Sequence, residues 1–140
     1  MNTELSRLNR LIKKQDEIYH QYARKSGLTD TQFWVLYALC ESRDALCQNS
    51  FCENWCYSKQ TVNAAVASLE KAGLLRLDYA EGSRKQKELA LTDAGEAFCD
   101  AHIRTFMRAE GSALLSLSAQ QREDFFATME QLLAGLEKAL

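Results

Sequence analysis

Proline is absent from this sequence of 140 residues, and glycine occurs only six times. Both residues interrupt regular helices, so their scarcity favours long helices with few breaks. Leucine, alanine, glutamate, glutamine, lysine and arginine, which are all good helix formers, dominate what remains. We therefore expect a mostly α protein, with a chain length that suits a single domain and its own hydrophobic core.

Long apolar runs are missing too. No stretch approaches the about 20 apolar residues that cross a bilayer, and residues 1–10 are too polar for a signal peptide. These absences predict a cytoplasmic protein with no membrane partner. The five cysteines cannot all pair within one chain, and a reducing cytosol would keep them as thiols.

Motifs that carry catalysis are also absent. The sequence has no glycine-rich phosphate loop, no His-Glu-x-x-His and no Gly-x-Ser-x-Gly. Cys99 and His102 stand three apart, as a Cys–His nucleophile pair on one helix face would, but packing and surface roles are commoner for such residues. We predict no enzymatic activity, no cofactor and no bound metal.

A strong positive charge is lacking as well, since the net charge is −2 and the isoelectric point near 5.7. The segment from Tyr57 to Glu88 nevertheless holds six basic and four acidic residues, a local net charge of +2. Positive charge is therefore modestly concentrated in one part of the chain, which is where a nucleic acid would bind.

That segment contains a well-delimited helix, residues 58–72. Ser58 is a suitable N-cap, and Gly73 stands where a helix end often requires a left-handed residue. Val62, Val66 and Leu69 repeat at helical spacing and predict a buried side.

The other side of this helix carries small or hydrogen-bonding residues and no carboxylate before Glu70. Gln60 and Asn63 are neighbours on it, and each amide can pair with an adenine edge in a DNA major groove. The alternative is an ordinary amphipathic surface helix.

Flanking patterns predict the remaining helices. Apolar spacing indicates a helix over residues 4–25, and Thr29 with Gln32 forms a capping box that opens a helix to about Ser42. A short helix over residues 48–55 and a turn at Cys56 would complete a helix-turn-helix. Beyond it, one long helix is expected over residues 92–115 and another after a second capping box, Ser118 with Gln121.

Residues 75–79 and 87–91 alternate apolar and polar side chains and predict a two-stranded hairpin. Its tip holds Arg84 and Lys85, whose long side chains can reach a phosphate or an adjacent minor groove. The alternative is a solvated charged loop.

This order of elements resembles the MarR (multiple-antibiotic-resistance regulator) family of winged helix-turn-helix transcription factors. The resemblance rests on three groups of residues: Leu28-Thr29 with Gln32-Phe33, the run from Thr61-Val62 to Gly73-Leu74, and Leu91-Thr92-Asp93-Ala94-Gly95. The implied fold is a mostly α single domain, residues 1–140, with a small two-stranded β-wing.

The resemblance implies a DNA-binding winged helix at about residues 29–91 between dimerisation helices at about 1–27 and 92–140. Each subunit of a homodimer would place the helix at residues 58–72 in a major groove. Two-fold symmetry then predicts a pseudo-palindromic operator with half-sites roughly 10 bp apart. Members usually repress, and many release DNA in response to a small phenolic compound, a metal or an oxidant.

Matching residues provide the predicted DNA contacts: Ser58, Lys59, Gln60, Thr61, Asn63, Ala64, Arg84, Lys85 and Lys87. Gln60 and Asn63 would read bases, with Thr61 as a helper, and the charged residues would hold phosphates. The family's wing commonly carries Asp-x-Arg, but Ser83 and Lys85 stand at those positions here. Lysine lacks the planar fork of arginine, so a weaker wing is expected.

Two further sets of residues are candidates for regulation. An effector pocket would use Tyr19, His20, Tyr22, Trp34 and Tyr37, unless these are core or dimer-interface residues. A redox or thiolate metal site would use Cys47, Cys52 and Cys56, unless they pack as small hydrophobic residues. A third alternative is a winged helix that docks proteins and does not bind DNA.

Overall fold

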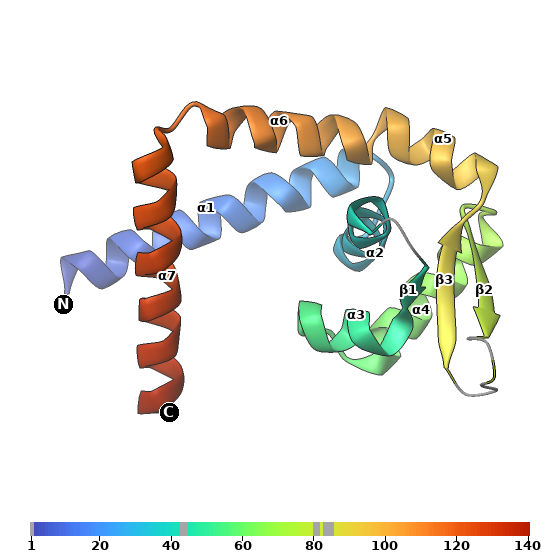
Figure 1. The fold of residues 1–140 in the computed structure, drawn as a ribbon, viewed down its shortest axis with the longest axis horizontal. Coiled ribbons are helices and arrows are strands. Elements are labelled where there is room, and N and C mark those ends of the chain that lie inside the picture. Colours follow the sequence, from blue (N-terminus) through green and yellow to red (C-terminus); the bar gives the residue numbers. More distant parts are fainter. Residues whose placement is uncertain (1, 43–44, 80–81, 83–85) are drawn as a thin grey trace. The chain divides into compact units, whose positions relative to one another are not determined.

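The computed structural model describes residues 2–42, 45–79, 82 and 86–140, and within them it contains seven helices and a three-stranded sheet (Figure 1). The elements follow in the order α1 Thr3–Lys25, α2 Asp30–Glu41, β1 Leu46–Cys47, α3 Gln48–Trp55, α4 Lys59–Lys71, β2 Leu75–Tyr79, β3 Lys87–Leu91, α5 Asp93–Ala101, α6 Ile103–Leu115 and α7 Ala119–Ala139. The chain divides into two compact units, residues 1–104 and 105–140. The predicted fold class, a mostly α winged helix-turn-helix, is confirmed.

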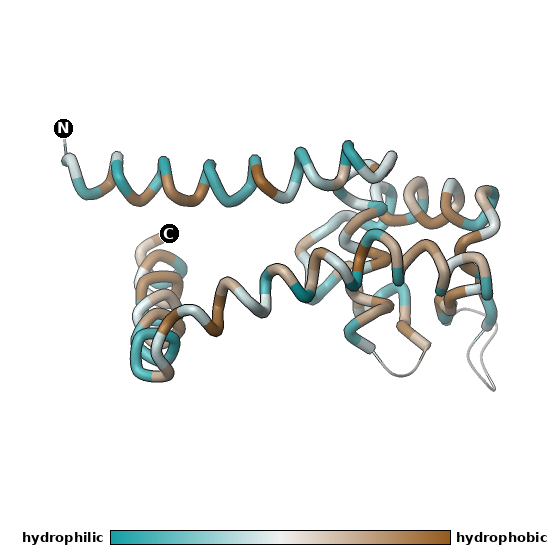
Figure 2. The backbone as a smooth tube through the Cα atoms, turned by 90° about the horizontal axis from the view of Figure 1, so that it is seen from above, coloured by the Kyte–Doolittle hydropathy of each residue, from teal (hydrophilic) through white to brown (hydrophobic). Residues whose placement is uncertain are grey.

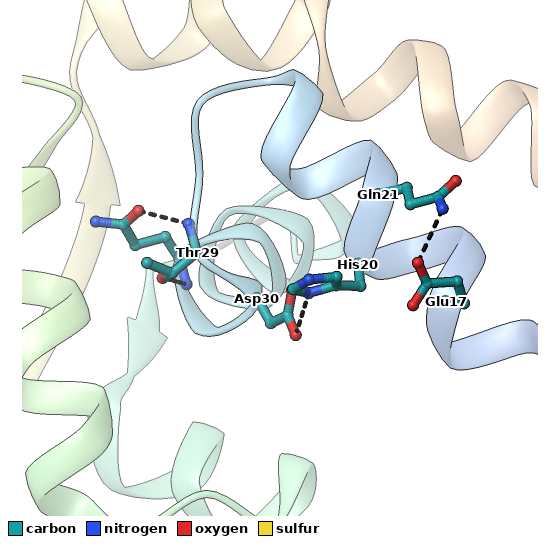
Figure 3. A network of polar contacts seen from close by, with 6 residues as sticks. Glu17, His20, Gln21, Thr29 and Asp30 are labelled. Atoms are coloured by element: carbon teal, nitrogen blue, oxygen red, sulfur yellow. Dashed lines mark hydrogen bonds and ion pairs between the residues drawn. The ribbon is translucent and has the colours of Figure 1, made fainter. Parts of the chain in front are cut away.

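Helix α2 is at the centre of the core of the first unit, where it packs against α4, α5 and β3. Its buried residues are Phe33, Val35, Leu36, Ala38 and Leu39. Tyr37 and Cys40, which periodicity also places inside, are only half-buried. The predicted capping box is present, with Gln32 N–H donating to Thr29 Oγ1 at 3.2 Å and Thr29 N–H to Gln32 Oε1 at 2.9 Å (Figure 3).

The sheet has the strand order β1-β3-β2 and is antiparallel throughout. Leu75 pairs with Leu91 at one end of the wing, and Leu46 of β1 pairs with Leu89. Leu75 and Leu89 are buried, and they anchor the wing in the core. Strand β1 was not predicted, because two residues are too few to display an alternating pattern.

The start of α5 is hydrogen-bonded to the residues that follow α4. Thr92 N–H donates to the Leu74 carbonyl at 3.2 Å, and the Thr92 hydroxyl donates to the Gly73 carbonyl at 2.5 Å. The same hydroxyl accepts the N–H of Gly95 at 3.0 Å and so caps α5. A Cβ built on Gly95 would lie only 1.8 Å from the Leu74 carbonyl oxygen, so this close approach requires glycine.

The single helix predicted over residues 92–115 is in fact two helices, α5 and α6. His102 leaves helical geometry between them, with φ −117° and ψ −49°. Its carbonyl accepts a hydrogen bond of 2.6 Å from the hydroxyl of Tyr22 on α1. A bond between residues 80 positions apart leaves no trace in local periodicity, so the pattern could not locate the break.

Two helices, one in each unit, carry apolar side chains on exposed surfaces. On α1, apolar residues recur along the helix among polar ones (Figure 2). Among them, Leu5, Leu11 and Ile18 are more than half exposed. Helix α7 has no buried residue, and its exposed apolar residues include Phe125, Phe126, Leu132, Leu133 and Leu136. Among the described residues, no helix is long and apolar enough to cross a membrane.

Candidate nucleic-acid interface

Helix α4 has the two contrasting sides that the sequence predicts. Ser58 caps it by accepting the N–H of Thr61 at 3.2 Å, and Gly73 ends it with a left-handed φ of 77°. The side that packs on the core is buried and consists of Val62, Ala65, Val66 and Leu69. This packing fixes the rotation of the helix and therefore determines which side chains face solvent.

The opposite side carries most of the residues predicted to contact DNA, and Lys87 lies on β3. Those that the structure describes are all exposed: Ser58, Lys59, Gln60, Thr61, Asn63, Ala64 and Lys87. Helix α4 has no acidic residue before Glu70, so its first turns present no charge that repels phosphate. Arg84 and Lys85, the predicted contacts at the wing tip, lie outside the described residues.

A small hollow of about 170 Å³ lies beside the first turns of α4, and the residues around it come from α3, α4 and β3. It is lined by Lys59 and Lys87 together with the amide side chains of Gln48, Asn49 and Asn63. Ammonium and amide N–H groups donate hydrogen bonds, and phosphate oxygens accept them. The hollow therefore has the chemistry to hold a phosphate group beside α4.

Gln48 orients one of the two predicted base-reading residues. Its side chain is 6% exposed, and its Nε2 donates a hydrogen bond to Asn63 Oδ1. Its own Oε1 is buried without a hydrogen-bond partner among the described residues. The bond uses one acceptor position of Asn63 and none of its N–H donors. Sequence reasoning missed Gln48, because nothing local distinguishes a buried glutamine from an exposed one.

The wing consists of residues 75–79 paired with residues 87–91. Arg76 and Asp78 form an ion pair of 3.2 Å on β2, and both side chains are largely exposed. Asp78 therefore offsets part of the positive charge of Arg76. Lys87, by contrast, lies at the end of β3 next to the wing tip and lines the hollow beside α4, so the wing supplies a cation there.

Cys56 forms the turn of the helix-turn-helix in the left-handed conformation, with φ 57° and ψ 36°. It is the only residue other than glycine with a positive φ in the described part of the chain. That conformation costs a residue with a Cβ about 1–2 kcal/mol. The turn thus keeps the geometry that glycine would adopt, and it places an exposed thiol between α3 and α4.

An open cavity of about 480 Å³ gathers three of the five residues predicted for an effector pocket. Its lining consists of Gln15, Asp16, Tyr19, His20, Asp30, Phe33, Trp34 and Tyr57. His20 Nδ1 lies 2.8 Å from Asp30 Oδ1 (Figure 3), so the wall includes a polar pair beside the aromatic rings. Burial raises the pKa of the Tyr57 hydroxyl.

The other two predicted pocket residues, Tyr22 and Tyr37, lie outside this lining. The Tyr22 hydroxyl donates to the His102 carbonyl, as described above. The Tyr37 ring packs against Trp34 and Trp55, with centroids 5.2 and 6.1 Å apart. Both side chains are half-buried and make these contacts within the chain.

The three cysteines predicted for redox or metal chemistry differ in environment. Gln86 Nε2 donates to Cys47 Sγ at 3.2 Å, and this bond, aided by the Ser50 backbone N–H, lowers the pKa of the Cys47 thiol. Cys52 is buried, which raises the pKa of its thiol, and Cys56 is exposed. No group of three or more metal-binding side chains gathers among the described residues.

Comparison with known proteins links this geometry to one family. The MarR family model matches residues 26–87. No curated protein sequence matches the chain. Among solved structures, NMB1585, a MarR family regulator from Neisseria meningitidis, is 24% identical with a TM-score of 0.82, over 99% of this chain and 96% of that one.

Two more solved structures share the fold. A complex of S. aureus MepR with DNA is 23% identical with a TM-score of 0.72, over 94% of this chain and 96% of that one. A MarR transcriptional regulator from Methanosarcina mazei Go1 is 19% identical with a TM-score of 0.71, over 99% and 100%. The family model matches the part of the chain that holds the helix-turn-helix and β2, and the fold of these MarR family regulators extends along nearly the whole chain.

Proposed function

We propose that the protein is a cytoplasmic transcriptional repressor that binds a pseudo-palindromic operator as a homodimer and is released by a small effector. The observation that carries this proposal is the two-sided α4, which is held by its buried side and exposes amides and a lysine on the other. Such a surface fits a major groove. The likeness in fold to S. aureus MepR, which was solved bound to DNA, supports the same role here.

The proposed DNA contacts divide into residues that would read bases and residues that would bind phosphates. Gln60 and Asn63 would read base edges, with Thr61 and Ala64 beside them on the exposed side of α4. The Thr61 hydroxyl lies 2.7 Å from the Ser58 hydroxyl, which would position both near a phosphate. Around them, Lys59, Lys87 and the wing-tip residues Arg84 and Lys85 would hold the DNA backbone, and this positions the helix but carries no sequence information.

Dimerisation would cover the exposed apolar residues of α1 and those of α7. Contiguous apolar surface on a protein usually marks a site of association. A symmetric dimer buries the same surface on both copies and presents two α4 helices to two half-sites.

The effector would occupy the cavity lined by Tyr19, His20 and Trp34. Its aromatic walls suit a small phenolic compound, and the His20–Asp30 pair offers polar partners. Tyr57 in the same lining immediately precedes Ser58, the cap of α4. An occupant of the cavity would thus act directly on the start of the recognition helix.

Selection of bound duplexes from a random pool tests the proposal. We expect enrichment of a palindrome, with the logarithm of affinity falling linearly with the logarithm of salt concentration. If no sequence is enriched and binding does not depend on salt, the DNA-binding role is wrong. The remaining interpretation would then be a winged helix that docks proteins.

Asn63→Ala and Lys87→Ala should separate base reading from phosphate binding. Asn63→Ala should cost about 1–3 kcal/mol on the operator and relax specificity at one base position, whereas Lys87→Ala should weaken all duplexes similarly and reduce the salt slope by about one. Fluorescence anisotropy on specific and random duplexes measures both. Equal losses on the two duplexes for Asn63→Ala would remove it from the base readers.

A second candidate function, an oxidant-responsive regulator, is favoured by the environment of Cys47. Its thiol has a lowered pKa at the start of α3, so a larger thiolate fraction is available to a hydroperoxide. A sulfenic acid there would disturb α3 and the adjoining hollow.

Peroxide treatment should therefore weaken operator binding severalfold in the wild type and leave Cys47→Ser unaffected. Anisotropy combined with thiol counting tests this expectation. Loss of the Cys47 thiol at unchanged operator affinity would refute the second function, while the role in DNA binding would stand.

A further inference from the structure

We propose that Gln48 determines base specificity without contacting DNA, by fixing which end of the Asn63 amide faces the major groove. Among the described residues, Gln48 is the only polar side chain that is buried, with 6% of its surface exposed. Its Nε2 donates a hydrogen bond to Asn63 Oδ1. The inference rests on the proposed DNA-binding function and adds to it a positioning residue that lies outside α4.

The direction of this hydrogen bond decides what Asn63 can offer to a base. An asparagine amide has an acceptor end, Oδ1, and a donor end, Nδ2, which carries two N–H groups. Because Gln48 binds Oδ1, the planar amide directs Nδ2 away from α3 on the exposed side of α4. Asn63 would therefore meet DNA as a donor. Such a group suits guanine, which presents only acceptors in the major groove, and does not suit the amino group of cytosine.

The chain on both sides of Gln48 is held in place by the fold. Cys47 precedes it and pairs with Glu88 in the sheet, and Gln48 itself begins α3, which packs against α4. A buried side chain on a fixed backbone has few accessible rotamers, so its hydrogen bond can hold a partner in one orientation. Asn63 is exposed, and without this bond its amide would be free to turn either end toward a base.

Stability does not explain an amide at position 48. Gln48 Oε1 is buried without a hydrogen-bond partner among the described residues, and an unpaired buried acceptor costs free energy. The bond to an exposed asparagine offsets little of this cost, because water can satisfy the same asparagine in the unbonded state. Methionine has a similar length and is apolar, so it would fill the same space without the cost. The amide is therefore best explained by its bond to Asn63.

Duplexes that differ at the one base pair whose preference is lost in Asn63→Ala test this assignment. We expect the wild type to favour guanine over cytosine there by about fivefold or more. Gln48→Met should lose most of this preference while its Tm stays at or above that of the wild type. Asn49→Ala removes an exposed amide from the lining of the same hollow and should keep the preference. A purely structural role for Gln48 would lower the Tm and leave the preference unchanged.

Gln48→Glu is a stricter test, because an ionised carboxylate only accepts hydrogen bonds. Asn63 must then donate to it through Nδ2, which leaves Oδ1 facing the groove. We expect the preference to reverse toward cytosine, whose amino group is a donor. The added negative charge weakens binding to every duplex alike. The ratio of the two affinities is therefore compared, at a pH near 8 that lies well above the ordinary pKa of a carboxyl group.

A measurement on the free protein separates this inference from the DNA-binding function. Nuclear magnetic relaxation of the Asn63 side-chain nitrogen should show an ordered amide in the wild type and a mobile one in Gln48→Met. A mobile amide in the wild type, or a wild-type preference for guanine in both Gln48 variants, would overturn the proposal and leave DNA binding intact. Should both variants fold poorly, the wild-type relaxation still decides. A wild type without preference at any base pair would overturn the DNA-binding function and this assignment with it.

Discussion

Replacing Leu132 and Leu136 of α7 together by glutamate should make the protein monomeric and weaken operator binding roughly 100-fold or more. The two residues lie one helical turn apart and are 44% and 53% exposed, so the change costs the isolated subunit little. In the proposed dimer the same positions would bury four unpaired carboxylates, a large penalty. In a dimer, binding of one half-site raises the effective concentration of the second α4 at the other half-site. A monomer loses this gain.

Sedimentation would report the mass of the variant, and anisotropy its operator affinity. Gln131→Glu adds a carboxylate at an exposed polar position of the same helix and provides the matched control. If the double variant remains a dimer, α7 is not the interface. If it is a monomer that binds the operator as tightly as the wild type, a homodimeric mode of binding is wrong.

Gly95→Ala should reduce the free energy of unfolding by about 3 kcal/mol, near the upper end of typical overpacking costs. The added Cβ would meet the Leu74 carbonyl oxygen at 1.8 Å and the carbonyl carbon at 2.9 Å. Both atoms belong to the backbone, so no side chain can rotate away. The start of α5 would have to move off the end of α4, and the Thr92 bonds to Gly73 and Leu74 would be lost with it.

Urea unfolding followed by circular dichroism measures this cost. The control is Gly111→Ala in α6, where the added Cβ meets nothing within 4 Å. Because alanine is the better helix former, this control should be neutral or more stable by up to about 1 kcal/mol. A Gly95→Ala protein as stable as the wild type would mean that α5 can shift without cost.

Much of the fold could be predicted because its signals are local. Ser58, the Thr29 capping box and the spacing of Val62, Val66 and Leu69 lie within one or two turns, and the structure places all of them as predicted. The predicted DNA-contact residues on α4 share its exposed side for the same reason, since helical periodicity decides which residues face solvent. Their contacts with DNA stay predictions.

Contacts between distant parts of the chain could not be predicted from the sequence. The hydrogen bond from Gln48 to Asn63 depends on how α3 packs against α4. The break at His102 depends in the same way on a hydroxyl from α1. Periodicity reports which side of a helix is buried, but it does not name the residue that will lie opposite.

The bond between Gln48 and Asn63 bears on how the protein's targets can diverge. With an acceptor position of Asn63 already used, its two N–H donors become the main means of reading a base. Adenine and guanine both present N7 as an acceptor in the major groove, and only their six-position groups differ. We expect aligned operators to show either purine at the base that Asn63 contacts. A transition mutation there would be tolerated, so genes could enter or leave the regulated set without the loss of a binding site.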